Sequence, residues 1–153
     1  MENEYDERGN GTKASYYGID GEPVLDYAGI AGWVREYDIR GNCTGERYFG
    51  TDGKPVLCSD GYAGYEIVYD ERGNEIRVSY FGAKGEPVMC TEGYAGWESE
   101  FDERNHEISR TFVGVYGEPV LPVFGYTTII FEYNEIGECV RERYYDADGY
   151  EVY

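Results

Sequence analysis

Histidine, basic residues and long apolar runs are scarce in this 153-residue chain, and each shortage argues against a class of function. With His106 as the only histidine, no nucleophile, base and orienting group can be assembled around an imidazole, so we expect a protein that is not an enzyme. Thirteen basic residues against 31 acidic ones give a net charge of −18, which repels nucleic-acid phosphates and anionic lipids. We therefore expect no nucleic acid among its partners.

The sequence also shows neither a secretory signal nor a segment that would anchor the chain in a membrane. No apolar run approaches the roughly 20 residues of a membrane-spanning helix, so no membrane insertion is expected. The segment from Met1 to Glu7 has neither the basic nor the apolar region of a secretory signal, so no signal peptide is predicted.

The four cysteines form no Cys-x-x-Cys pair, which argues against zinc. Cys58 and Cys90 are 32 residues apart, and Cys43 and Cys139 occupy a second pair of equivalent positions. A Cys58–Cys90 disulfide would require single strands stacked about 4.8 Å apart, whereas whole sheets stacked about 10 Å apart would forbid it. We expect free thiols because no signal peptide is predicted.

What the chain has in abundance is tyrosine, 18 residues, within a repeated pattern. Aromatic residues recur every 32 positions, and a fixed period of this size predicts a repeat protein. The equivalent residues are Tyr5, Tyr37, Tyr69, Phe101 and Tyr133. Aligned on this period, the chain is one domain of five repeats, residues 1–25, 33–57, 65–89, 97–121 and 129–153. Four linkers join them, residues 26–32, 58–64, 90–96 and 122–128.

Each repeat predicts three short strands. In the first strand of each repeat, as in residues 65–69, the first, third and fifth residues are mostly apolar or aromatic and the second and fourth are often acidic, which indicates a strand with one buried face. A turn opened by Asp70 leads to the second strand, residues 75–81, with aromatic residues on both faces. The third strand, residues 86–89, contains a proline, which lacks a backbone donor and so predicts a sheet edge.

The fourth residue of the first turn is predicted to adopt a positive φ. Glycine stands there in four repeats, as in Gly73, because it adopts this conformation without steric cost. The exception is Asn105, and asparagine is the non-glycine residue that tolerates positive φ best. His106 follows it in a position that holds Asn10, Asn42 and Asn74 in other repeats, so we interpret this histidine as a turn residue.

We predict an all-β fold, a solenoid-like tandem array of five three-stranded antiparallel meanders. A repeat of about 25 residues is too small to fold alone, so neighbouring repeats must cover its apolar surface. The alternative is a small five-bladed β-propeller, although propeller blades usually have four strands and about 40 residues. The fourth linker, residues 122–128, departs from the Gly-Tyr-Ala-Gly pattern and is the expected site of irregularity.

The Tyr-Asp-x-x-Gly-Asn core resembles the YD repeats of RHS-type bacterial proteins. It occurs at residues 5–10, 37–42 and 69–74 and, with changes, at 101–106. The resemblance implies tandem β-hairpins and allows a cell-surface location. Residues 143–150 are similar to choline- and glucan-binding repeats in their aromatic pair and turn, but the tryptophan-rich ligand cage of those repeats is missing.

The candidate binding residues are aromatic side chains of the linkers and of the strands that follow them. They recur once per repeat, so stacked repeats would align them as a ladder suited to sugar rings or extended peptides. The alternative is that these rings pack one repeat onto the next. The candidates are Trp33, Tyr62, Tyr65, Tyr94, Trp97 and Tyr126.

These observations predict a module that binds a protein or glycan through an acidic, aromatic surface. One alternative is a purely structural spacer or shell segment. Another is a calcium-stabilised module, because the turns cluster carboxylates such as Asp70 and Glu71. Lys84 stands where Asp20 and Asp52 stand in other repeats and would spoil such a ligand set, so we expect no cofactor.

Overall fold

The computed structural model describes residues 1–153, and every regular element in it is a β-strand. The residues group into two compact units. The first unit comprises Met1–Ile67 with Tyr80–Val88, and the second comprises Val68–Ser79 with Met89–Tyr153. The chain holds no helix with the length and apolarity needed to span a membrane.

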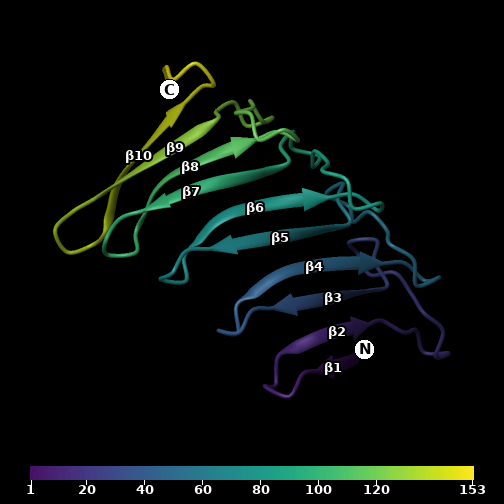
Figure 1. Ribbon diagram of the computed structural model, residues 1–153. Helices are drawn as coiled ribbons and strands as arrows, with labels where there is room; N and C mark the ends of the chain where they lie inside the picture. Colours follow the sequence, from purple (N-terminus) through teal and green to yellow (C-terminus); the bar gives the residue numbers. More distant parts are fainter. The chain divides into compact units, whose positions relative to one another are not determined.

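In both units the strands pair antiparallel in the order of the sequence (Figure 1). The first five strands are β1 (Glu2–Tyr5), β2 (Gly11–Ser15), β3 (Gly32–Tyr37), β4 (Cys43–Phe49) and β5 (Gly64–Tyr69). The remaining six are β6 (Glu75–Phe81), β7 (Gly96–Phe101), β8 (Glu107–Val113), β9 (Thr128–Tyr133), β10 (Cys139–Tyr145) and β11 (Glu151–Val152). The predicted all-β fold of antiparallel meanders is confirmed.

Consecutive repeats are joined by hydrogen-bonded strand pairs. At each of the four junctions, three residues of the second strand of one repeat pair with the first strand of the next. In the β4–β5 junction, for example, Glu46 lies opposite Tyr65. The alternative of a five-bladed propeller is therefore wrong, because propeller blades are separate sheets and these repeats share their backbone ladder.

The predicted third strand is shorter than expected in four repeats. It is reduced to one bridge between its proline and the end of the second strand, as between Phe49 and Pro55. The missing N–H of proline prevents the ladder from continuing there. In the fifth repeat Glu151 replaces the proline, and a two-residue strand, β11, forms against Tyr144 and Tyr145.

The first turns have the predicted conformation. Gly73 has a φ of 86° and Asn105 a φ of 66°, so the one non-glycine residue adopts the same positive φ as its glycine counterparts. In each turn the opening side chain accepts a hydrogen bond from the backbone N–H four residues later, with Asp70 accepting from Asn74 at 2.9 Å. An aspartate carboxylate thus caps the turn of four hairpins, and the amide oxygen of Asn134 takes its place in the fifth.

The core is thin and lies mainly at the end of the strands where the linkers enter. Ala31 and Ala63, each 2% exposed, lie between consecutive second strands of the first unit, and Ala95 occupies the equivalent linker position at 6% exposure. The Ala63 N–H donates to Phe81 O at 2.7 Å, and the Ala63 carbonyl accepts from the Tyr48 N–H at 2.8 Å. The linker backbone therefore bridges the second strands of neighbouring repeats, which explains why a small side chain stands at this position.

Candidate binding surface

The linker tyrosines pack against the first aromatic residue of the adjacent second strands. The Tyr62 ring stacks on Tyr80 with centroids 4.2 Å apart and an interplanar angle of 8°, and it also contacts Tyr48 at 6.0 Å. Tyr126 contacts Phe112 at 6.3 Å and Tyr144 at 4.6 Å. These rings hold neighbouring repeats together, which agrees with the alternative interpretation that the linker aromatics pack one repeat onto the next. Each ring still keeps part of its surface exposed.

Tyr94 belongs to a larger aromatic cluster in the second unit. Its ring contacts Phe112 at 4.9 Å, Trp97 at 6.4 Å and Phe124 at 6.1 Å. Phe124 comes from the fourth linker, so the irregular linker supplies an extra ring to this cluster. Of the six predicted residues, Tyr94 and Trp97 are thus brought into direct contact.

The other candidates, Trp33, Tyr65 and Trp97, each occupy the second position of a strand, in β3, β5 and β7. All three are half-buried. No helix or second sheet covers the strands of either unit, so the exposed part of each ring faces the surroundings directly.

A charged cluster lies beside Trp33 on the same face of the first unit. The guanidinium of Arg35, two residues further along β3, lies 3.8 Å from the centre of the Trp33 ring, a cation–π contact. Arg35 Nε donates to Glu46, which is only 6% exposed, and the Tyr65 hydroxyl donates to the same carboxylate at 3.3 Å. Strand register explains the grouping, because Arg35 pairs with Glu46 and Glu46 with Tyr65.

The electrostatics of this cluster favour a charged Arg35. Burial alone would lower the pKa of Arg35, but the hydrogen bond to Glu46 and the charge of that carboxylate outweigh it and raise this pKa. Burial, followed by the negative charge of Glu46, raises the pKa of Tyr65. The cluster therefore places a guanidinium cation, a neutral phenol and a carboxylate next to an indole.

The second unit repeats this chemistry with both charged residues on the same strand, β8. Arg110 of β8 lies 5.1 Å from the centre of the Trp97 ring and makes two hydrogen bonds to Glu107, at 2.7 and 2.9 Å. Ser99 stands at the Arg35 position and donates to Glu107 at 2.8 Å. Each tryptophan of the chain therefore has an arginine over its ring, and each arginine is fixed by a glutamate.

Sequence reasoning missed these two arginine–glutamate pairs. The available signal was Trp33-x-Arg35, because residues two apart on a strand share a face. For Trp97 no such signal exists within its own strand, since Arg110 lies on β8 and reaches the same face through the pairing of Trp97 with Phe112 and of Ser99 with Arg110.

The opposite face of the second unit carries an open groove of about 370 Å³ near the fourth linker. Thr111 and Thr128 pair across β8 and β9 with their hydroxyl oxygens 3.0 Å apart. Thr127, which replaces the alanine of the other linkers, is 1% exposed, and its hydroxyl has no hydrogen-bond partner. The irregularity predicted for the fourth linker is thus polar as well as aromatic.

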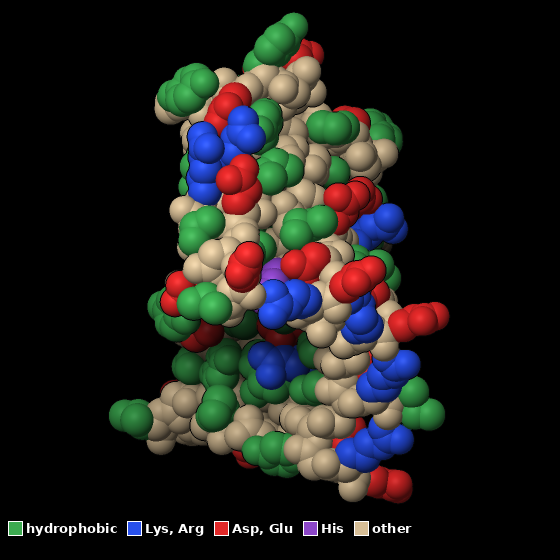
Figure 2. Space-filling view, turned by 90° about the vertical axis from the view of Figure 1, so that its left-hand side faces the viewer, with side chains coloured by type: hydrophobic (Ala, Val, Ile, Leu, Met, Phe, Trp, Pro, Cys, Tyr) green, Lys and Arg blue, Asp and Glu red, His purple; other side chains and the backbone are tan.

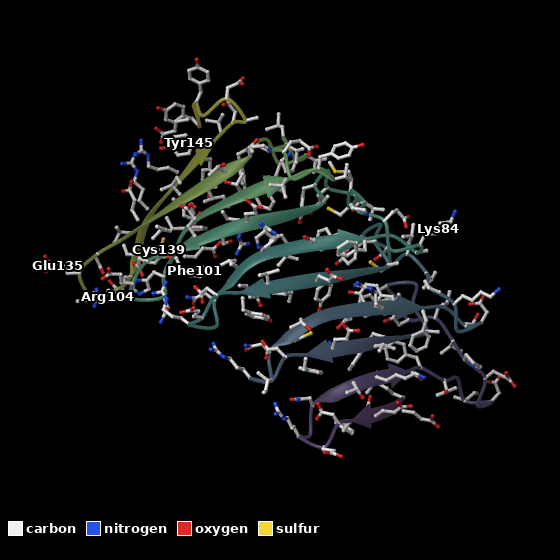
Figure 3. The ribbon with its side chains drawn as sticks, viewed as in Figure 1. Lys84, Phe101, Arg104, Glu135, Cys139 and Tyr145 are labelled. Atoms are coloured by element: carbon white, nitrogen blue, oxygen red, sulfur yellow. The ribbon has the colours of Figure 1, made fainter.

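The first turns carry hydrogen bonds between repeats but no metal cluster. Arg72 Nη1 donates to Asp102 O at 2.7 Å in the turn of the next repeat. Arg104 Nη1 donates in the same way to Glu135 O at 3.0 Å, and Figure 3 shows these two residues in neighbouring turns. Figure 2 shows basic and acidic side chains mixed over the side that carries these turns. No group of three or more His, Cys, Asp or Glu side chains is placed to hold a metal ion.

His106 takes over the contacts of the asparagines it replaces. Its backbone N–H donates to Asp102 Oδ1 at 2.9 Å, and its ring nitrogen Nδ1 lies 3.2 Å from Asp102 Oδ2. Asn74 makes the same two contacts with Asp70. The imidazole also stacks on Tyr133 with centroids 4.6 Å apart.

The four cysteines are free thiols.

Neither a family model nor a curated protein sequence matches this chain. The resemblance to YD repeats stays a prediction from the motif residues.

Proposed function

We propose that this chain is a non-enzymatic repeat module that binds an extended glycan or protein segment through half-exposed aromatic surfaces, Trp33 with Tyr65 in the first unit and Trp97 in the second. The observation that supports the proposal best is the half-exposed indole with a fixed guanidinium over its ring, at Trp33 and again at Trp97. An apolar ring beside oriented charged groups is the combination that recognises sugar rings and extended peptides.

The net charge of the chain further limits which classes of ligand these surfaces are expected to bind. A net charge of −18 disfavours anionic glycans and acidic peptides, because long-range repulsion opposes their approach. Neutral glycans and basic peptide segments are the favoured partners. The linker residues Tyr62, Tyr94 and Tyr126 act in this proposal mainly as the packing that positions the strands.

The experiment uses the two tryptophans as its probe, since the chain has no others. Intrinsic fluorescence is followed while the full chain is titrated with a linear glucose hexasaccharide in one arm and a lysine-rich decapeptide in the other. We expect a saturable change in one arm. Trp33→Phe and Arg35→Gln should weaken that binding, whereas Tyr27→Ala, at a fully exposed linker tyrosine, should leave it unchanged.

A spacer or shell segment is the second candidate function, and the packing of Tyr62 between Tyr48 and Tyr80 favours it. This function expects no saturable change in either arm. A calcium-stabilised module is the third candidate, and it expects a melting temperature that rises with calcium and falls with a chelator.

A further inference from the structure

Two strand edges of the chain are left without a partner. β1 pairs with β2 alone. On β10, Tyr144 and Tyr145 pair with β11, while Arg141 to Arg143 pair with β9 on one side only. At the four junctions between repeats, the equivalents of these two edges pair with each other. An unpaired edge offers free N–H and C=O groups to another strand.

The side chains on the two edges have complementary charges in the register of the internal junctions. At the β6–β7 junction Arg77 lies opposite Glu98 and forms an ion pair of 3.2 Å. Moved by the repeat period, Arg77 becomes Arg141 on β10 and Glu98 becomes Glu2 on β1. Arg141 and Glu2 are both exposed, so each can meet a partner.

A second pair of groups matches in the same register. Tyr37 donates its hydroxyl to Gly11 O at 2.7 Å, and Tyr133 does the same to Glu107 O at 2.7 Å, each reaching the preceding repeat. The equivalent pair on the free edges is Tyr5, which is 64% exposed, and the carbonyl of Cys139 at the start of β10 (Figure 3).

We propose that the β10 edge of one copy of this chain binds the β1 edge of a second copy, antiparallel, with Arg141 opposite Glu2 and Tyr5 donating to Cys139 O. The contact reproduces two of the three residue pairs of an internal junction, Arg141 with Glu2 and Glu142 with Met1, and is independent of the proposed ligand surface. It joins two different surfaces, so each bound copy still offers one free edge, and association does not have to end at a dimer.

Two features make this contact weaker than an internal junction. Ile136 stands where Arg72 and Arg104 stand in other repeats, so the hydrogen bond from one turn to the next is lost. The net charge of −18 also makes two copies repel each other. Association is therefore expected at high protein concentration and near physiological salt, where the Debye length is about 8 Å and the long-range repulsion is screened.

Sedimentation velocity over a concentration series of the full chain tests the contact. We expect the weight-average sedimentation coefficient to rise with concentration. Glu2→Arg and Arg141→Glu should each weaken association about tenfold, because each places like charges opposite one another. The double variant restores the pair in reversed order and should recover association. Circular dichroism confirms that each variant is folded.

Matched controls separate the edge contact from the change in net charge. Asp60→Arg and Lys84→Glu alter the charge by the same amounts at exposed turn residues away from both edges. They should associate like the parent chain or follow the change in net charge alone. A chain that stays monomeric at every concentration would overturn the proposal, as would an Arg141→Glu variant that associates normally or a double variant that is no better than the single ones.

Discussion

At the scale of single residues, the tightest constraint is the glycine that opens the first strand after a linker. A Cβ built on Gly32 would lie 2.1 Å from Ala14 O and 2.3 Å from Phe49 Cζ. At Gly64 the nearest atom, Glu46 O, would lie at 2.3 Å. At Gly32 and Gly64 the close approach of the preceding strand therefore requires glycine, a reason that differs from the positive φ of the turn glycines, whereas Thr128 opens the equivalent strand β9.

Gly32→Ala should lower the free energy of unfolding by about 1–3 kcal/mol, because the added methyl group forces two strands apart. The control is Gly11→Ala on the neighbouring strand, where the nearest atom to the new Cβ is 3.6 Å away. That variant should stay within about 0.5 kcal/mol of the parent. Urea titration of the three proteins measures the difference, and equal stability of the two variants would contradict the steric explanation.

At the scale of strands and linkers, stability depends on rings that connect neighbouring repeats. The sheet has no second layer, so the usual core between two layers is replaced by contacts along one layer. Tyr62 illustrates this, since its ring lies against Tyr48 of β4 and Tyr80 of β6. The linker aromatics are therefore structural elements even where part of the ring remains exposed.

Tyr62→Ala should lower the free energy of unfolding by about 2–3 kcal/mol, from lost apolar burial and from the stacked contact, which is itself worth about 1 kcal/mol. Tyr27→Ala removes the same side chain from a linker position that is fully exposed and should cost less than about 0.5 kcal/mol. Thermal melts followed by circular dichroism compare the two. A Tyr62 variant as stable as the Tyr27 variant would show that the stack contributes little.

At the scale of the whole molecule, the repeated turns couple stability to pH. The pKa of Asp6, Asp38, Asp70 and Asp102 is lowered below its ordinary value of 3.8. The largest cause is a hydrogen bond from the residue four positions later, from the side chain of Asn10 for Asp6 and from the backbone N–H for the others. Because the folded state binds these protons less readily, it gains stability above about pH 4.

This stability should be lost as the pH falls below about 4 and through the lowered pKa values of the folded state. Asp70→Asn should reduce the slope of melting temperature against pH in that range, because asparagine keeps the turn, as Asn134 does, but carries no titrating group. Asp60→Asn, at an exposed aspartate outside these turns, is the control. Melts between pH 7 and pH 2.5 provide the measurement, and parallel curves for both variants would refute the assignment.

The period of 32 residues by itself predicted five repeats, and it determined the place of the turns and the conformation of their glycines. The turn conformations are local properties, because Asp70 and Gly73 determine the backbone of a turn that is only a few residues long. Strand alternation likewise predicted the first two strands of each repeat.

Only the tertiary structure decided how repeats join and what lies beside the candidate aromatics. The pairing of Glu46 with Tyr65, residues 19 positions apart in the sequence, depends on the register between β4 and β5. A shift of this register by one residue would turn every side chain of the shifted strand to the other face of the sheet. For the same reason, Arg110 could not be assigned to Trp97 from the sequence. Hydrogen bonding across the junctions, rather than the pattern within a repeat, determines which side chains meet.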